Sequence, residues 1–324
     1  MIIHRRGLLA ASALAATGLA RPGLAQGQWP DRPIRLIVGF PAGGPTDFAA
    51  RLLQEPLQQL WGQPIVIENR AGATQNSAAE LVARAAPDGY TLFLSTSAHT
   101  TNPAVFTRLS WDPIRDFTPI VIIYSAPTVL FTGRNQPFRT VRDVVEAAKK
   151  NPGMAASTSG IATSGHFATE DFMRVAGIEL TVVPYRGAPP ALQDVVGGRI
   201  PITFSTLSGA IGLARDGNLR PIAVAAPRRT PVFPDVPTME EAGFPIRDTS
   251  PWYSFMGPAG LPEAIVQRIN TDTQALLRRP DVIKRIEDSG GFVVGEGPAE
   301  FRARIPREIA VNTEIARAAN IKVE

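Results

Sequence analysis

Short β-branched segments alternate with amphipathic segments of helical length along most of this chain. In the first part we expect strands at 34–40, 65–68 and 91–95 and helices at 47–60 and 76–85. This order of elements is typical of parallel sheets that are covered by helices. The sequence therefore predicts an α/β fold.

The same alternation returns after Pro127. Thr140 and Asp143 have the spacing of a capping box, which predicts a helix over 141–150. Further strands are expected at 154–157, 181–185, 202–204 and 222–225, with helices at 167–175, 191–196 and 209–215. From Pro262 onward the chain predicts three helices that start near Pro262, Pro280 and Pro298, since proline is tolerated in a first helical turn.

Two extended stretches, 120–129 and 250–258, lie between these blocks. We interpret them as crossings between two lobes. A chain of about 300 residues has the size at which one hydrophobic core tends to divide into two. The predicted first lobe comprises residues 26–126 and 250–324, and the predicted second lobe comprises residues 127–249.

The first 25 residues differ in composition from the rest of the chain. A basic start at Arg5 and Arg6 precedes an apolar run, and small residues end the segment at Ala25. This pattern predicts a signal peptide that is cleaved near Ala25 and export of the mature protein, which the resemblance described below places in the periplasm. The apolar run is shorter than the roughly 20 residues of a membrane span. The paired arginines leave both the general secretory route and the twin-arginine route open.

Charge and cysteine content exclude several classes of protein. Arg5, Arg6 and Arg21 supply three of the four net positive charges, so the remaining chain is nearly neutral. It has no basic block that would attract nucleic acid, and we expect no nucleic-acid partner. The chain contains no cysteine, which excludes a disulfide framework.

A glycine-rich turn at residues 40–47 is the strongest local feature. It joins the first predicted strand to the first predicted helix, where backbone amides and the helix dipole favour an anion. A tight turn capped by Thr46 or Asp47 is the alternative interpretation. The ligand contacts that we predict from this turn are Phe40, Ala42, Gly43, Gly44, Thr46 and Asp47.

Three further polar segments follow predicted strands. Ser95, Thr96 and Ser97 end the third strand, at the edge where open α/β sheets bind their ligands. In the second lobe a hydroxyl-rich turn contains Thr163, Ser164 and His166, and a strand ends at Tyr185, Arg186, Gly187 and Ala188. Arg186 is suited to bidentate pairing with a carboxylate, or it is simply solvated.

Catalytic patterns are largely missing. After residue 25 the histidines are His99 and His166, and neither has the spacing of a zinc site, so we expect no metal and no cofactor. Ser164 lies near His166, but the nucleophile elbow of a serine hydrolase is not present. We therefore expect a protein that is not an enzyme.

These residues together resemble the tripartite tricarboxylate transporter receptors, also called Bug or TctC-like periplasmic solute-binding proteins. The similarity runs along nearly the whole chain after the leader. Its motifs lie at residues 29–34, 40–47, 62–64, 68–70, 86–90, 116–117, 151–153, 184–187 and 234–238.

The resemblance implies a Venus-flytrap fold of type II with a ligand cleft between the lobes. It implies that amides and hydroxyls of the 40–47 turn hold a ligand carboxylate, and that 185–188 and the Thr163 turn complete the site. It further implies delivery to the integral-membrane permease subunits of a tripartite transporter. We expect the receptor itself to be a monomer.

The chain departs from the usual family pattern at three positions. Gln75 and Ala162 stand where glycine is common, and Ser205 stands where many relatives have Asp. We include Ser205 among the predicted ligand contacts, since an uncharged side chain tolerates a second carboxylate on the ligand. A receptor that serves a signalling partner and a cleft hydrolase are the alternative functions.

Overall fold

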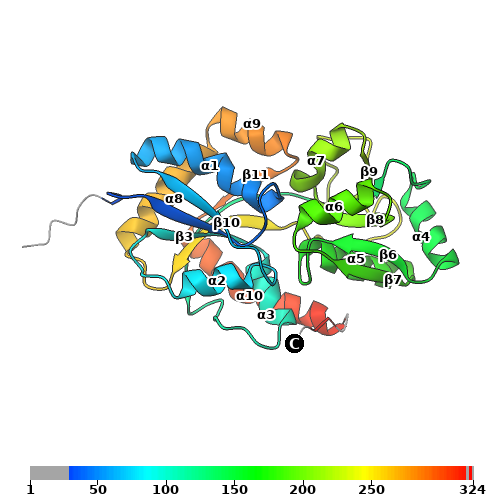
Figure 1. Ribbon diagram of the computed structural model, residues 1–324, viewed down its shortest axis with the longest axis horizontal. Coiled ribbons are helices and arrows are strands. Elements are labelled where there is room, and N and C mark those ends of the chain that lie inside the picture. Colours follow the sequence, from blue (N-terminus) through cyan, green and yellow to red (C-terminus); the bar gives the residue numbers. More distant parts are fainter. Residues whose placement is uncertain (1–28, 319–320, 323–324) are drawn as a thin grey trace, which may run out of the picture.

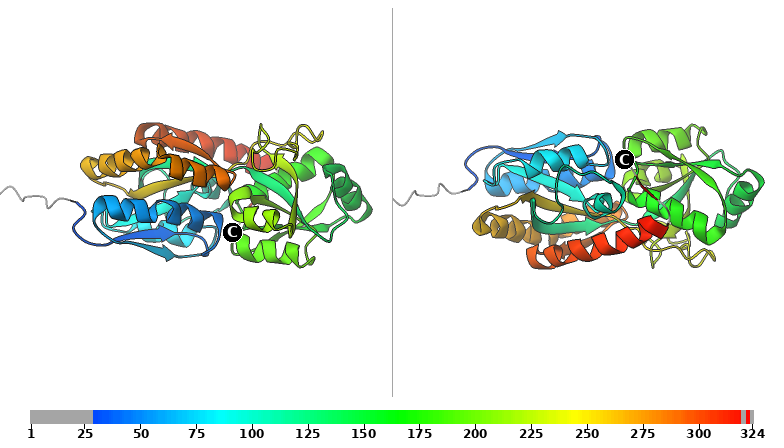
Figure 2. Two further views of the ribbon diagram at one scale, coloured as in Figure 1. Left: turned by 90° about the horizontal axis from the view of Figure 1, so that it is seen from above. Right: turned by 90° about the horizontal axis from the view of Figure 1, so that it is seen from below.

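The computed structural model describes residues 29–318 and 321–322, and in this range the chain forms two sheets, each with its own helices. Figure 1 shows the two units side by side along the long axis of the molecule, and both views in Figure 2 show the same separation. We call them the first and the second lobe. The predicted two-lobed α/β fold is confirmed. The predicted signal peptide, residues 1–25, lies outside the described residues.

The first lobe is built from both ends of the chain. Its sheet has the strand order β11-β4-β10-β3-β1-β2. Its elements are β1 (Ile34–Val38), α1 (Pro45–Trp61), β2 (Ile65–Asn69), α2 (Asn76–Ala83), β3 (Thr91–Thr96), α3 (Ala98–Val105), β4 (Phe117–Ser125), β10 (Trp252–Pro258), α8 (Glu263–Leu277), α9 (Pro280–Asp288), β11 (Phe292–Glu296) and α10 (Pro298–Ala318).

Helices cover both faces of this sheet. Leu53 of α1 and Ile269 of α8 belong to the hydrophobic core on one face, and Val82 of α2 and Phe301 of α10 belong to the core on the other face. Burial on both faces explains why β4 is buried at every position and shows no polar alternation.

The second lobe is continuous in sequence. Its sheet has the order β7-β6-β8-β5-β9. Its elements are β5 (Thr128–Gly133), α4 (Val141–Lys150), β6 (Met154–Thr158), α5 (Ser164–Ala176), β7 (Leu180–Pro184), α6 (Ala188–Val196), β8 (Ile202–Thr206), α7 (Leu207–Arg215) and β9 (Leu219–Ala225). The predicted capping box of α4 is present, since Thr140 Oγ1 accepts from Asp143 N (3.2 Å) and Asp143 Oδ2 accepts from Thr140 N (2.9 Å).

Both sheets are mixed, whereas the sequence predicted parallel sheets. β1 pairs in parallel with β2 and β3, and β6 pairs in parallel with β7 and β8. β10 is antiparallel to β3 and β4, and β5 is antiparallel to β8 and β9. β10 and β5 adjoin the passages between the lobes, where the chain enters each sheet without a crossover helix. β11, which the sequence did not predict, lies between α9 and α10 and is antiparallel to β4.

The two stretches that we interpreted as crossings lie mostly within the sheets. Residues 120–125 belong to β4, and residues 252–258 form β10. The first passage between the sheets, from β4 to β5, therefore consists of Ala126 and Pro127 only. The chain returns to the first sheet in the segment between β9 and β10. The lobe boundaries at 126/127 and 249/250 remain a prediction.

None of the helices in the described part of the chain combines the length and the apolarity that a membrane span requires.

Candidate functional site

A small cavity lies between the two lobes, and we call it the central cavity. Its volume is about 40 Å³. Both lobes and the passage between them contribute to its lining, which consists of Phe40, Pro41, Gly44, Pro45, Thr46, Thr96, Ser97, Ala98, Ser159, Thr163, Ser164, Ala188, Pro189, Thr206, Pro251 and Tyr253.

Five helices begin at the central cavity. Each contributes its N-cap residue, the first residues of its first turn, or both: Gly44, Pro45 and Thr46 for α1, Ser97 and Ala98 for α3, Thr163 and Ser164 for α5, Ala188 and Pro189 for α6, and Thr206 for α7. The first amides of a helix have no partner inside the helix, and the helix dipole places positive potential there. Pro45 of α1 and Pro189 and Pro190 of α6 have no amide hydrogen, so these two ends contribute fewer donors than the others. Five such ends around one cavity favour an anion.

The lining carries no charged side chain among the described residues. It offers hydroxyl groups instead, on Thr46, Thr96, Ser97, Ser159, Thr163, Ser164, Thr206 and Tyr253. An anion in this cavity would be bound by neutral amide and hydroxyl donors and by helix dipoles. Because these donors are fixed in the fold, little ordering is needed when the ligand binds.

Asp47 fixes the shape of the glycine-rich turn. Its carboxylate accepts hydrogen bonds from Gly43 N (3.0 Å), Arg51 Nε (2.8 Å) and Asn69 Nδ2 (3.2 Å). Burial alone would raise the pKa of this carboxyl, but these donors together hold the pKa below its ordinary value. Asp47 therefore stays ionised and holds the turn in place. Gly43 has a positive φ of 78°, which favours glycine.

Gln75 plays the corresponding role for the end of β3. It is fully buried, and its Oε1 accepts from Thr96 N (3.3 Å) and from Thr96 Oγ1 (3.2 Å). Its φ of 66° explains why a glycine suits this position. Gly39 must remain glycine beside it, since a Cβ there would lie 2.2 Å from Gln75 Cβ. The sequence marked Gln75 only as a departure from the family pattern.

His166 supports the turn of the second lobe from behind. Its Nδ1 accepts from Ala162 N (3.1 Å), and its Nε2 lies 3.3 Å from Glu170 Oε1. Ala162 has a positive φ of 62°, and this hydrogen bond stabilises that conformation. Thr163 Oγ1 donates to Gly160 O (2.7 Å), so its hydroxyl hydrogen is engaged within the turn. Ser164 is the next hydroxyl along the lining.

Direct contacts between the lobes close the cavity. Thr74 Oγ1 donates to Ile161 O (2.6 Å), and Thr101 Oγ1 donates to Ala162 O (2.6 Å). The backbone at Gly187 lies so near Pro41 that a Cβ would be 2.7 Å from Pro41 Cδ. The described arrangement is therefore one in which the lobes are closed.

The predicted site residues divide into two groups. Phe40, Gly44, Thr46, Thr96, Ser97, Thr163, Ser164 and Ala188 line the central cavity. The remaining predicted residues do not line it: Ala42, Gly43, Asp47, Ser95, His166, Tyr185, Arg186, Gly187 and Ser205. Several of these support the lining residues, as shown above for Asp47, Gly43 and His166. Whether any predicted residue touches a ligand stays a prediction.

Tyr185 and Arg186 lie outside the central cavity. Tyr185 donates its hydroxyl hydrogen to Asp194 in α6, and this bond, together with burial, raises the pKa of Tyr185. Arg186 lines a separate hollow of about 410 Å³, which we call the Arg186 hollow and which also includes Phe40, Pro41, Ser159 and Gly187. An arginine clamp at the central cavity is therefore not formed in this structure.

Other lining residues were not predicted from the sequence: Pro41, Pro45, Ala98, Ser159, Pro189, Thr206, Pro251 and Tyr253. Thr206 lines the cavity, whereas the neighbouring Ser205, which we had predicted, does not. The signal that could have identified Thr206 is a hydroxyl residue at the point where a strand ends and a helix begins. Tyr253 stacks on Tyr124 with 4.7 Å between ring centroids. Burial raises the pKa of Tyr253 to about 12, so its hydroxyl is neutral.

Comparison with known proteins shows which proteins this chain is similar to. Residues 49–311 match the family described as "Tripartite tricarboxylate transporter family receptor". Protein BugT of Bordetella pertussis is 31% identical over 314 residues, which are 96% of each chain. An R. palustris protein solved with adipate is 35% identical with a TM-score of 0.88, and the match covers 91% of this chain and 99% of the other. MatC from Rhodopseudomonas palustris, solved with bound malate, is 31% identical with a TM-score of 0.83, over 88% and 99% of the chains.

Proposed function

Because this chain belongs to the tripartite tricarboxylate transporter receptor family, a family of periplasmic solute-binding proteins, we propose that it captures a small mono- or dicarboxylate, binds one carboxylate group of this ligand in the central cavity and delivers the ligand to the permease subunits of a tripartite transporter. The observation that carries the proposal is the meeting of five helix N-termini around a cavity without charged side chains. A carboxylate group suits these donors, because it accepts several hydrogen bonds at once.

The expected affinity follows from the number of contacts. Hydrogen bonds to a charged group contribute about 1.5–3 kcal/mol each, and a helix terminus adds up to about 2 kcal/mol when partly buried. Desolvation of the ligand and closure of the lobes oppose this gain. We expect a dissociation constant near micromolar, or about −8 kcal/mol. The adipate and malate in the two similar structures make these compounds the first probes.

The hydrogen bonds of His166 argue against the alternative function, a cleft hydrolase. Its Nδ1 accepts from Ala162 N, and its Nε2 lies beside Glu170, so the ring is engaged in supporting the turn. A hydrolase would need a ring nitrogen directed at Ser164 Oγ. The proposed receptor binds its ligand without changing it.

Calorimetry on the chain without residues 1–25 tests the proposal. Adipate or malate should bind, whereas inorganic phosphate and a neutral sugar should bind poorly. If only the sugar or phosphate binds, the proposal is wrong.

Two variants test how the carboxylate is held. Gly44 lines the cavity at a φ of −90°, and a Cβ there would lie 3.5 Å from Pro41 O and 3.6 Å from Pro189 Cδ. A Cβ is therefore accommodated, but the two methyl groups of Gly44→Val would occupy part of the roughly 40 Å³ that the carboxylate needs, and binding should fall at least about tenfold. Arg186→Ala should bind almost as the unmodified protein does. Thermal melting by circular dichroism serves as the folding control for both variants. Normal binding by Gly44→Val together with lost binding by Arg186→Ala would instead indicate an arginine clamp.

A further inference from the structure

The central cavity is too small for the ligands proposed above. Its volume of about 40 Å³ is about three times the roughly 10–15 Å³ that a cavity needs in order to hold one water molecule. One carboxylate group fills it. The rest of a four- to six-carbon ligand must therefore extend into a neighbouring space.

A larger hollow adjoins the central cavity, and we call it the outer hollow. Its volume is about 490 Å³, within the usual range for ligand sites. Ser97 and Ser164 line both spaces, so the outer hollow continues directly from the central cavity. Its other walls are one face of α10, one face of α5, the end of α3 nearest the cavity and residues 247–250 between the lobes.

The Arg186 hollow also adjoins the central cavity, but the way into it is narrow. Pro41 lies against the Gly187 backbone at this boundary, so closely that no Cβ fits between them. The hydrogen bond from Thr74 to Ile161 also joins the lobes on this side. The boundary with the outer hollow consists of two serines with small side chains. A ligand chain passes more readily into the outer hollow.

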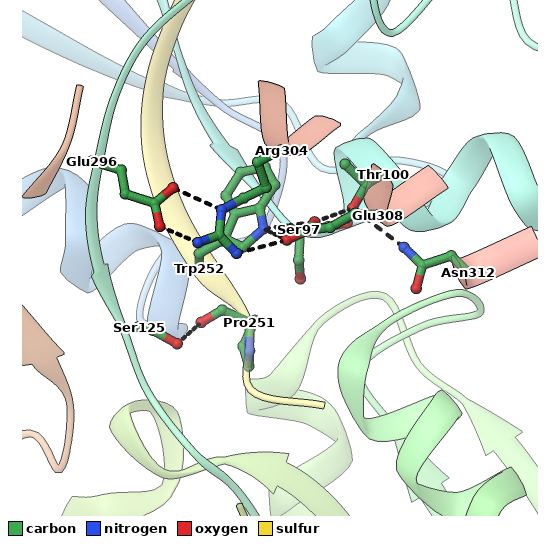
Figure 3. A network of polar contacts seen from close by, with 9 residues as sticks. All are labelled: Ser97, Thr100, Ser125, Pro251, Trp252, Glu296, Arg304, Glu308 and Asn312. Carbon is green, nitrogen blue, oxygen red and sulfur yellow. Dashed lines mark hydrogen bonds and ion pairs between the residues drawn. The ribbon is translucent and has the colours of Figure 1, made fainter. Parts of the chain in front are cut away.

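Glu308 and Asp171 of the outer hollow are already in ion pairs, whereas Asp248, which also lines it, has no ion pair among the described residues and accepts from Ser250 N (2.9 Å). Figure 3 shows Glu308, whose carboxylate accepts from Arg304 Nη1 (3.0 Å), Thr100 Oγ1 (2.8 Å) and Trp252 Nε1 (3.0 Å). Asp171 is buried and accepts from Arg247 Nη2 (2.8 Å) and from Arg174 Nη2 (2.8 Å).

Arg307 is the exception among the arginines of this hollow. It is exposed, and no carboxylate of the described residues lies within 4.0 Å of it. It occupies the same face of α10 as Val311 and Ile315, which lie four and eight residues further on. Phe167 of α5 completes an apolar wall beside it. Val311 is an exposed large apolar side chain (54%), and an aliphatic ligand would cover it.

From this arrangement we infer that the outer hollow receives the far end of an elongated dicarboxylate, with Arg307 pairing its second carboxylate. The inference rests on the proposed function, since the first carboxylate is placed in the central cavity. The apolar wall contacts the methylene chain. A guanidinium suits the second carboxylate because it forms two parallel hydrogen bonds with it. Arg307 would then select dicarboxylates over monocarboxylates of the same length.

The test compares three six-carbon probes by calorimetry: adipate, hexanoate and 6-aminohexanoate. We expect adipate to bind best. Arg307→Gln should weaken adipate binding about tenfold and change hexanoate binding less than about twofold. Arg307→Lys should keep part of the preference for adipate over hexanoate, because lysine retains the positive charge but lacks the planar guanidinium group. Arg302→Gln is the matched control, since Arg302 lies on α10 and is exposed but does not line the hollow.

Each other outcome has a definite meaning. If adipate and hexanoate both bind and Arg307→Gln leaves their ratio unchanged, the inference is wrong while the proposed function stands. If Arg186→Gln removes the preference for adipate instead, the far end lies in the Arg186 hollow. If 6-aminohexanoate binds best and Asp248→Asn abolishes the preference for 6-aminohexanoate, the outer hollow selects a cation and the inference is wrong. If none of the three probes binds to the unmodified protein, nor malate, the proposed function fails as well.

Discussion

Gly187 provides a direct test of lobe closure. It is the N-cap residue of α6 in the second lobe, and its backbone faces Pro41 of the first lobe. A Cβ at this position would lie 2.7 Å from Pro41 Cδ and 2.8 Å from Pro41 Cγ. The best separation for two carbon atoms is about 3.5–4.0 Å. Gly187→Ala therefore forces the lobes about 1 Å apart at this contact.

The substitution has two separable costs. Gly187 has a φ of 122°, which L-residues rarely adopt, and the resulting strain of about 1–3 kcal/mol is present whether the lobes are open or closed. That strain lowers the free energy of unfolding. The clash with Pro41 exists only when the lobes are closed, so it lowers ligand affinity. We expect adipate to bind at least about tenfold more weakly, which corresponds to about 1.4 kcal/mol.

A double-mutant cycle separates the clash from the strain. Pro41→Ala removes the two carbon atoms that the new Cβ would meet. The double variant should therefore bind adipate more tightly than the losses of the two single variants, taken together, would predict. Its free energy of unfolding should stay lowered. Calorimetry gives the affinities, and small-angle scattering reports whether adipate still compacts the protein. If Gly187→Ala binds adipate within twofold of the unmodified protein and compacts equally, the contact between Pro41 and Gly187 does not belong to the bound state.

Three further predictions concern stability. Asp47→Asn should lower the free energy of unfolding by about 1–2 kcal/mol, because the charged acceptor for Arg51 and Gly43 is lost; urea unfolding at pH 7 measures this, and an unchanged midpoint would contradict it. Burial lowers the pKa of His99 to about 4, so stability should fall as the pH decreases from about 6.5 to 4, where the unfolded chain binds a proton that the folded chain excludes. Guanidinium unfolding at pH 7 and 4.5 should show a smaller decrease for His99→Phe than for the unmodified protein, and an equal decrease would refute the assignment. Hydrogen bonds from Arg35 and Arg70 lower the pKa of Glu68 to about 2, so their stabilisation is complete above about pH 4.5 and is lost as the pH falls toward 2. Glu68→Gln should therefore lose less stability than the unmodified protein between pH 5 and 3, as measured by urea unfolding.

The sequence by itself determined the features that depend on local chemistry. The capping box of α4, the glycine-rich turn before α1 and the helix starts at Pro280 and Pro298 are present in the structure. Each of these signals acts over a few residues, through a side-chain cap, a positive φ or a missing amide hydrogen. The α/β class could be predicted from the alternation of β-branched and amphipathic segments, and the division into two lobes from the length of the chain.

The positions of β4 and β10 within the sheet required the tertiary structure. β4 and β10 are buried at every position, so neither shows the alternation that identifies a strand with one solvated face. Helix α3 was not predicted, because Asn102 and Pro103 lower its helical propensity. It is stabilised instead by contacts with α10, which come from a distant part of the chain.

The orientation of each site residue was also decided by the tertiary structure. Ser205 and Thr206 are adjacent hydroxyl residues, and only Thr206 lines the central cavity. Tyr185 and Arg186 follow the end of a strand near the cleft. The Tyr185 hydroxyl, however, donates to Asp194 of α6, and Arg186 lines the Arg186 hollow. Successive side chains at a strand end point in different directions, and the partner that holds each one lies on another element. The meeting of five helix N-termini is a property of two folded and closed lobes, which no single segment of the sequence contains.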